Sequence, residues 1–194
     1  MQPQTVPEIA FRPLAETDMN TLIEWFGQPR IARWWNPSTD LNEVLAKYLP
    51  RINGYEPTAM WIVEIGEQPA GLLQCYRHAD YPQHDAAVGV ADAAGIDFLL
   101  AASHQGRGFA SSVLRDFASL VFELYSDVAC CVATPAQANE ASWRSLDRAG
   151  FTRAGECQPP DEPPAYTCVV ERPIASDDSL MRRGWWVGGC VFGW

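Results

Sequence analysis

The spacing of apolar residues in the first fifty positions predicts one strand followed by two helices. The strand covers residues 8–14, and the first helix covers residues 17–26 before a stop at Pro29. Capping-box residues open a second helix over residues 40–49, which ends at Pro50 because proline interrupts helices. The segment between the two helices is expected to be a connection.

The middle of the chain predicts a hairpin, a long loop and a buried strand. Residues 59–65 and 71–76 have the apolar content of strands, and the turn residues 66–69 join them. Residues 77–94 are polar and irregular, and a connection of that length favours a functional loop. Residues 95–101 form an apolar strand with one charged residue, Asp97.

The last third of the chain predicts two helices that alternate with three strands. Apolar residues recur at spacings of three and four between Val113 and Leu124, which indicates an amphipathic helix. A second helix is capped by Asn139 and ended by Gly150. The strands cover residues 128–133, 151–157 and 166–171. This order predicts a mixed α/β (α+β) fold in one domain, residues 9–172, with tails over 1–8 and 173–194 that lie outside it.

Charge and composition narrow the function. Asp and Glu number 24 against 14 Lys and Arg, so the formal charge is -10 and cations are favoured as partners over nucleic acid or anionic membranes. No apolar run is long enough to span a membrane and the start lacks a signal-peptide layout, so a cytoplasmic protein is expected. The six cysteines and three histidines lack metal-ligand spacing, which predicts no metal.

A glycine-rich turn between a strand and a helix is the strongest chemical signal. The turn reads Gln105, Gly106, Arg107, Gly108, Phe109 and Ala110. Glycines let the backbone approach a ligand closely, and the free N–H groups at a helix start attract phosphate. The turn lacks the lysine of a Walker A loop and the third glycine of a dinucleotide fingerprint. It therefore predicts an anion site of another type.

These residues carry a resemblance to a known family. The pattern set by Gln105, Gly108 and Ala110 resembles the acetyl-coenzyme A pyrophosphate loop of the GNAT acetyltransferases, and residues 139–151 resemble that superfamily's Asn-to-Gly-Phe segment. Within it, short blocks resemble aminoglycoside 6'-N-acetyltransferases in the same order: Glu24-Trp25, Trp34-Trp35, Tyr48-Leu49-Pro50, Gln74-Cys75-Tyr76 and Gly95-Ile96-Asp97. The resemblance implies a GNAT fold, in which a strongly bent mixed sheet has splayed central strands and flanking helices.

The resemblance also implies site residues. Acetyl-coenzyme A would bind the backbone of Leu99 and Leu100, the turn from Gln105 to Ala110, and Asn139. Asp97 matches the family's proposed base; attraction of the cationic amine is the alternative role. The acceptor would be a polycationic amine lined by Trp35, Tyr76, Asp80 and Asp85, since aromatic faces and carboxylates both bind ammonium groups.

Two departures from the family pattern leave the function open. Thr134 stands where the most similar enzymes carry an acidic residue, and Leu146 replaces the tyrosine that protonates the departing thiolate. The expected activity is acetyl transfer from acetyl-coenzyme A to an aminoglycoside 6'-amino group, which confers resistance. The alternatives are acyl transfer to a siderophore lysine precursor or another metabolite amine, and a non-catalytic acyl-coenzyme A binding module. Either a monomer or a homodimer is compatible with the sequence.

Overall fold

One seven-stranded sheet organises the computed structural model, which describes residues 7–35 and 37–173. The strand order is β1-β2-β3-β4-β5-β7-β6, and every neighbouring pair is antiparallel except β4 and β5. The strands are β1 (Ile9–Pro13), β2 (Ala59–Ile65), β3 (Gln68–Arg77), β4 (Ala93–Leu100), β5 (Cys130–Ala133), β6 (Thr152–Cys157) and β7 (Ala165–Glu171). The α helices of the described residues are α1 (Met19–Phe26), α2 (Pro29–Trp35), α3 (Leu41–Ile52), α4 (Pro82–Val88), α5 (Phe109–Leu124) and α6 (Glu140–Ala149).

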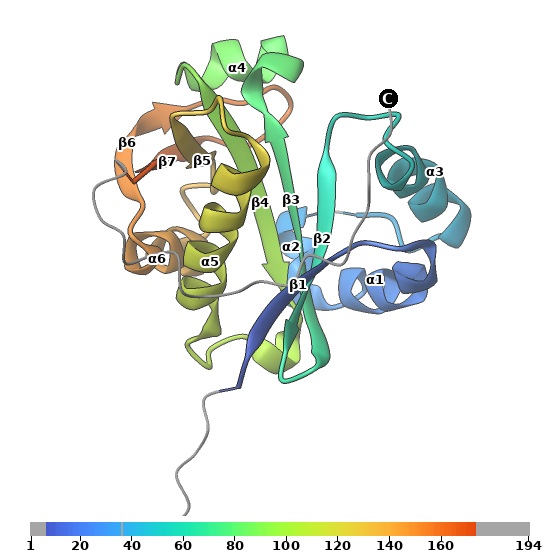
Figure 1. Cartoon of the computed structure of the whole chain (residues 1–194). Coiled ribbons are helices and arrows are strands. Elements are labelled where there is room, and N and C mark those ends of the chain that lie inside the picture. Colours follow the sequence, from blue (N-terminus) through green and yellow to red (C-terminus); the bar gives the residue numbers. More distant parts are fainter. Residues whose placement is uncertain (1–6, 36, 174–194) are drawn as a thin grey trace, which may run out of the picture.

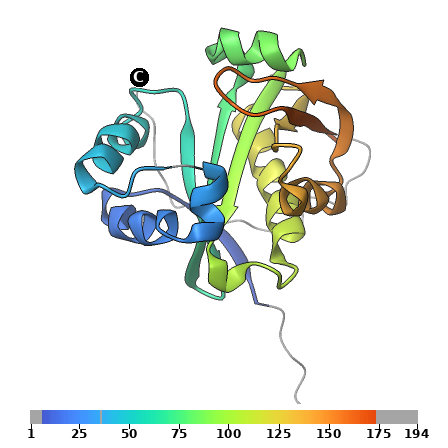
Figure 2. The same cartoon turned by 180° about the vertical axis from the view of Figure 1, so that it is seen from behind.

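The two faces of the sheet carry separate apolar cores. On one face, α1, α2 and α3 pack on Ile62, Leu72 and Leu99. On the other, α5 and α6 pack on residues of β2 to β5, and Phe117 of α5 is fully buried there. Figures 1 and 2 show α1 to α3 gathered around β1 to β3, with α5 and α6 at the β5 to β7 end. Strand β4, in the middle of the sheet, therefore lies between the two groups of helices.

The order of strands and of the longer helices agrees with the sequence; several boundaries shift by one to three residues, and four larger differences follow. The hairpin turn is only Gly66 and Glu67, which both have positive φ, as a tight two-residue hairpin requires. Pro29 does not stop a helix: it begins α2, since a first-turn proline loses no helical hydrogen bond. The segment of Trp34 and Trp35 is therefore helical. Helix α3 continues through Pro50 to Ile52.

The fourth difference lies in residues 77–94, which were expected to be a loop. This segment contains a short 3-10 turn, His78–Asp80, and the helix α4, which closes over one end of β3 and β4 (Figure 1). Pro82 begins α4 and Gly89 ends it with φ +69°. The helix escaped the sequence analysis because its seven residues are too short to show a helical period.

The tails were expected over residues 1–8 and 173–194. Strand β1 begins at Ile9. Apart from Pro173, the expected C-terminal tail lies outside the described residues. Within the described part of the chain, no helix combines the length and the apolar character needed to cross a membrane.

Candidate active site

Strands β4 and β5 diverge, and this opens the centre of the sheet. Their parallel pairing covers only Ala93 to Gly95 of β4, whereas β3 stays paired with β4 as far as Leu100. The splayed central strands expected from the sequence are thus confirmed. Beyond Gly95 no strand of the described residues lies along this edge of β4, and the backbone groups on that edge can bind a ligand.

Backbone direction decides which residues present those groups. The Ala101 N–H donates to the Ala70 carbonyl in line with β3, at 2.8 Å. The Leu100 carbonyl faces the other way and accepts a hydrogen bond from Gln105 Nε2 at 2.7 Å. Because successive residues of a strand alternate, Phe98 and Leu100 face the open edge while Leu99 faces β3. The backbone groups of Leu99 therefore face β3, so its predicted cofactor contact has no support from this register, and Phe98 presents its backbone groups to the open edge instead.

The glycine-rich turn has the geometry of an anion cradle. Gly106 and Gly108 have φ values of +72° and +85°, which L-residues rarely adopt, and a Cβ at either would meet no atom within 4 Å. The turn leads into the 16-residue α5, whose N-terminus has no side-chain cap. Its first N–H groups therefore still need acceptors. Arg107 is exposed beside them and lies 5.3 Å from the Phe109 ring.

These features fit the pyrophosphate of a coenzyme A thioester. Uncapped N–H donors, a positive helix end and an arginine are the groups that phosphates prefer. The side chain of Gln105 has a different part, since it ties the turn to the end of β4. Asn139 caps α6 by accepting from the Ser142 N–H at 3.3 Å, so its observed contact stabilises a helix. A cofactor contact for Asn139 stays a prediction.

Asp97 lies on the open part of β4, past the fork. Its Oδ2 accepts a hydrogen bond from Gln74 Nε2 at 2.7 Å, from the neighbouring strand. Burial raises the pKa of Asp97, and the Gln74 hydrogen bond and the charges of His84 and Arg51 oppose that rise. The carboxyl is therefore a stronger base than an ordinary aspartate. A raised pKa of this kind is frequent at functional sites.

Tyr76 lies beside Asp97 and marks the fork itself. A Cβ on Gly95 would lie 2.5 Å from the Tyr76 ring, so the absence of a side chain there lets the ring lie across β4. Its hydroxyl is 3.4 Å from His84 Nε2 of α4, and the ring contacts Tyr81 edge-on at 5.0 Å between centroids. Burial, then the charges of Asp97 and Glu162, raise the pKa of Tyr76.

Glu162 is a candidate site residue that the sequence analysis did not name. It comes from the proline-rich connection between β6 and β7, and burial and the charge of Asp97 raise its pKa. The charge of Asp97 thus acts on Glu162, although 65 positions separate the two residues in the chain. The only sequence signal was an acidic pair in that connection. We call Asp97, Gln74, Tyr76, His84 and Glu162 the Asp97 cluster.

The other predicted acceptor residues are placed unequally. Trp35, at the end of α2, packs at the edge of the core that contains Tyr48, and the charges of Asp97 and Arg51 act on the hydroxyl of Tyr48. Asp85 of α4 lies 3.6 Å from the buried His78 ring, behind Tyr76. Asp80 is exposed, and its charge acts on Arg77 and Tyr125 instead of on the cluster. Its predicted contact with substrate has no support from this placement.

The comparisons with known proteins agree with this geometry. A family model described as an acetyltransferase (GNAT) domain matches residues 15–159. The chain belongs to the GNAT acetyltransferases. It is 29% identical over 166 residues to aminoglycoside N(6')-acetyltransferases type 1 of Klebsiella pneumoniae and Serratia marcescens, with 81% of this chain and 81% of each relative covered.

Solved structures show the same fold. The aminoglycoside acetyltransferase AAC(6')-Ib with coenzyme A is 28% identical and superposes with a TM-score of 0.74, covering 85% of this chain and 95% of that chain. Its complex with coenzyme A and kanamycin gives a TM-score of 0.73 at 29% identity, with the same coverage. The fold expected from the sequence is therefore confirmed.

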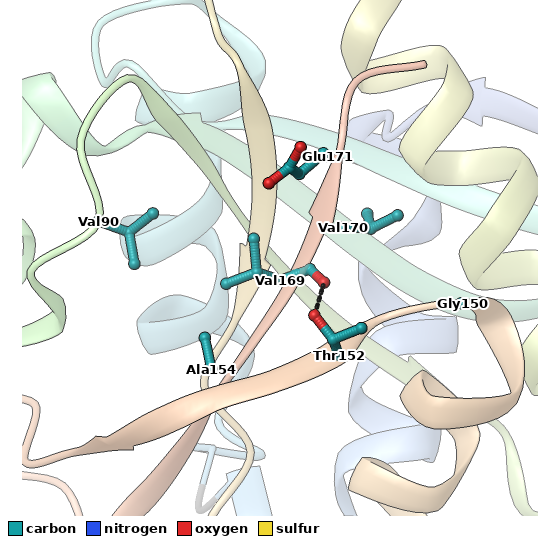
Figure 3. A pocket seen from close by; sticks show the side chains of 7 residues that line it. All are labelled: Val90, Gly150, Thr152, Ala154, Val169, Val170 and Glu171. Carbon is teal, nitrogen blue, oxygen red and sulfur yellow. Dashed lines mark hydrogen bonds between the residues drawn. The ribbon is translucent and has the colours of Figure 1, made fainter. Parts of the chain in front are cut away.

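Leu146 of this GNAT domain lies outside the Asp97 cluster. It is fully buried in the core, so no proton donor occupies that helix position. A shallow pocket of about 420 Å³ lies across β6 and β7 and is lined by Val90, Val169 and Glu171 among others (Figure 3). It contains no residue of the Asp97 cluster or of the glycine-rich turn, so it is separate from the candidate active site. Among residues 7–35 and 37–173, no group of His, Cys, Asp and Glu is arranged to hold a metal ion.

Proposed function

We propose that the chain transfers the acetyl group of acetyl-coenzyme A to the 6'-amino group of an aminoglycoside, which confers resistance to that antibiotic. The observation that carries the proposal is the position of Asp97 beside Tyr76 on the open part of β4, with Glu162 as a second carboxyl whose pKa the charge of Asp97 raises. Two carboxylates beside an aromatic ring suit a polycationic amine. The acetyltransferase domain is taken as residues 9–172.

Acetyl-coenzyme A supplies, when bound, an acetyl group activated as a thioester. The N-terminus of α5, Gly106, Gly108 and Arg107 would hold its pyrophosphate, for the electrostatic reasons given above. The backbone of Phe98 and Leu100 would bind the pantetheine arm along the open edge. Together they would place the acyl carbon next to Asp97, because both segments flank the same stretch of β4.

Asp97 would act as the base. An alkylamine has a pKa of roughly 10, so at neutral pH it arrives protonated and must lose a proton before its lone pair can attack a carbonyl carbon. The raised pKa of Asp97 strengthens it as an acceptor for that proton, while its negative charge first attracts the ammonium form. Both roles considered from the sequence thus belong to one residue.

Glu162 would bind a second ammonium group of the same substrate. Glu162 would compensate for the acidic residue that Thr134 replaces, because the two segments are neighbours. The Tyr166 N–H donates to the Pro135 carbonyl, and the Gln137 N–H donates to the Pro164 carbonyl. Tyr76 and Trp35 would contribute cation-π and stacking contacts. Asp85 would add negative charge from α4.

The experiment that tests the function is release of coenzyme A from acetyl-coenzyme A across a panel of amines. The panel contains kanamycin, tobramycin, gentamicin, lysine derivatives and simple polyamines, and NMR of the product identifies the acetylated nitrogen. Turnover of kanamycin at the 6'-amine supports the proposal. Turnover of a lysine derivative alone would replace the acceptor, and acyl-coenzyme A binding without any transfer would leave a non-catalytic binding module.

A further inference from the structure

A chain of polar contacts runs from helix α3 across two strands to Asp97. The Arg51 Nε lies 2.9 Å from Glu56 Oε2, and Arg51 Nη1 donates to Gln74 Oε1 at 3.0 Å. Gln74 Nε2 then donates to Asp97 Oδ2 at 2.7 Å. Arg51 is in the last turn of α3, which exists only because the helix continues past Pro50.

The order of donors and acceptors in this chain allows one arrangement. An arginine side chain only donates, so the Gln74 atom that faces Arg51 must be the amide oxygen. The amide nitrogen of Gln74 must then face Asp97, where it donates to Oδ2. An isolated glutamine can turn its amide over, but Arg51 prevents this. One oxygen of the carboxylate is therefore occupied and the other, Oδ1, is left for a proton.

We propose that Gln74 is a positioning residue for acetyl transfer: held by Arg51, it occupies Oδ2 of Asp97 and leaves Oδ1 as the atom that accepts the proton of the acceptor amine. The inference rests on the function proposed above. In the step it serves, one N–H proton moves to Oδ1 and the nitrogen lone pair bonds to the acetyl carbon. The carbon–sulfur bond breaks, and its electron pair leaves with the coenzyme A sulfur.

Glu56 is the second partner of Arg51, and its carboxylate balances the positive charge of the guanidinium. An unpaired guanidinium beside Asp97 would repel a cationic substrate from the carboxylate it must reach. The Arg51 side chain is largely buried and the Glu56 side chain is half-exposed, so Glu56 balances the charge from the solvent side. Arg51 can thus orient Gln74 at a small cost in substrate affinity.

Other ionisable groups face Asp97 from each neighbouring element, and they decide the expected pH effect. Burial favours its protonated form, whereas His84 of α4 and Arg51 of α3 favour its ionised form; Glu162 also interacts with Asp97, which raises the pKa of Glu162. The Gln74 hydrogen bond is the strongest of the contributions that favour ionisation. Loss of that bond should therefore move the acidic limb of the pH profile to higher pH.

The test uses Gln74→Met, Arg51→Met and the double variant in the full-length enzyme, with kcat measured against pH at saturating amine. Gln74→Met should lower kcat roughly ten-fold or more, the usual effect of losing a hydrogen bond to a charged group. Arg51→Met should lower kcat and shift the limb in the same direction. In the Gln74→Met background it should change kcat above the acidic limb no further, because its positioning effect acts through Gln74, although loss of its charge can still move the limb.

The matched control is Arg77→Met. Arg77 is the last residue of β3 and, like Arg51, forms an ion pair with a solvent-exposed carboxylate: its Nη2 lies 2.8 Å from Asp127 Oδ1. Unlike Arg51, it does not contact Gln74, the residue that holds Asp97. Its kcat and acidic limb should equal those of the wild type. Arg51→Met leaves β3 intact, so it still tests the inference if Gln74→Met fails to fold. A wild-type pH profile in Arg51→Met, or additive losses in the double variant, would overturn it.

A titration of the free enzyme separates this inference from the proposed function. The carboxyl carbon of Asp97 can be followed by NMR without any substrate, and it should titrate at higher pH in Gln74→Met than in the wild type. If no aminoglycoside is turned over but the titration moves, the function fails and the coupling of Gln74 to Asp97 stands. If the titration does not move, the positioning role is wrong whatever the substrate.

Discussion

At the scale of single residues, the candidate active site depends on carboxyls kept in unusual surroundings. Burial raises the pKa of both Asp97 and Glu162, and the charge of Asp97 adds to the rise at Glu162. Like charges that interact in this way are relieved when a cation lies between them. The arrangement thus favours a substrate with more than one ammonium group.

Replacing Asp97 with asparagine removes the base and keeps the shape. We expect Asp97→Asn to lower kcat by about 10²- to 10⁴-fold, the usual contribution of general-base catalysis, with coenzyme A affinity unchanged. The raised pKa means that the folded state holds this proton more tightly than the unfolded state, so ionisation weakens folding as pH rises through the folded pKa. Asp97→Asn should therefore be at least as stable as the wild type at neutral pH. Steady-state kinetics and thermal unfolding check both statements.

Replacing Glu162 with glutamine should separate substrate binding from chemistry. The KM for kanamycin should rise roughly ten-fold, the effect of losing a partly desolvated ion pair, while the KM for acetyl-coenzyme A stays the same. The acidic limb assigned to Asp97 should stay near its wild-type position, because the Asp97 pKa is set mainly by burial and by Gln74. Glu156→Gln, at an exposed position on β6, is the control. An unchanged KM for kanamycin would remove Glu162 from the site.

At the scale of elements, the turn into α5 and the fork beside β4 form the donor side. The turn could be identified from the sequence because glycine spacing is a local signal. Strand β4, which follows residues 77–94, was also predicted as a strand. The error at Leu99 arose because backbone direction depends on register with β3, which no local pattern reveals. Helix α4 and Glu162 were missed for a similar reason: short helices and loop contacts are set by packing.

The left-handed glycines of that turn provide an element-scale test. Gly108→Ala should lower stability by about 1–2 kcal/mol, the cost of a left-handed conformation for an L-residue, and should raise the KM for acetyl-coenzyme A. Gly150→Ala is the matched control, since Gly150 has φ +103° and equally open surroundings at the end of α6. It should lose stability without a change in KM. Equal KM values in the two variants would exclude the turn from the donor site.

At the scale of the whole molecule, charge and fold act on the two substrates in opposite directions. The formal charge of -10 attracts a polycation and repels a polyanion at long range. The fold class, the domain and most strands could be predicted from the sequence, because each rests on periodicity or on turn residues. The proposed acceptor side was predicted only in part: the family resemblance named Tyr76, Trp35 and Asp85, whereas Glu162 lies in a proline-rich connection that no local pattern links to Asp97.

Salt should therefore affect the two Michaelis constants differently. The Debye length falls from roughly 30 Å at 0.01 M to about 10 Å at 0.1 M ionic strength, so long-range attraction is largely screened over that range. We expect the KM for kanamycin to rise and the KM for acetyl-coenzyme A to stay level or fall. Kinetics at fixed pH over this range, with a neutral salt, measure both. Parallel changes in the two constants would mean that the overall charge does not guide the substrates.

The fork between β4 and β5 has a consequence for how the protein can evolve. The groups proposed to bind the donor belong to β4 and the turn into α5, whereas those proposed to bind the acceptor come mainly from α2, α4 and the connection before β7. Mutations in the second set can change which antibiotic is accepted while acyl-donor binding is retained. New resistance profiles are therefore accessible through short segments of surface chain, by single substitutions or by small insertions, without rebuilding the sheet.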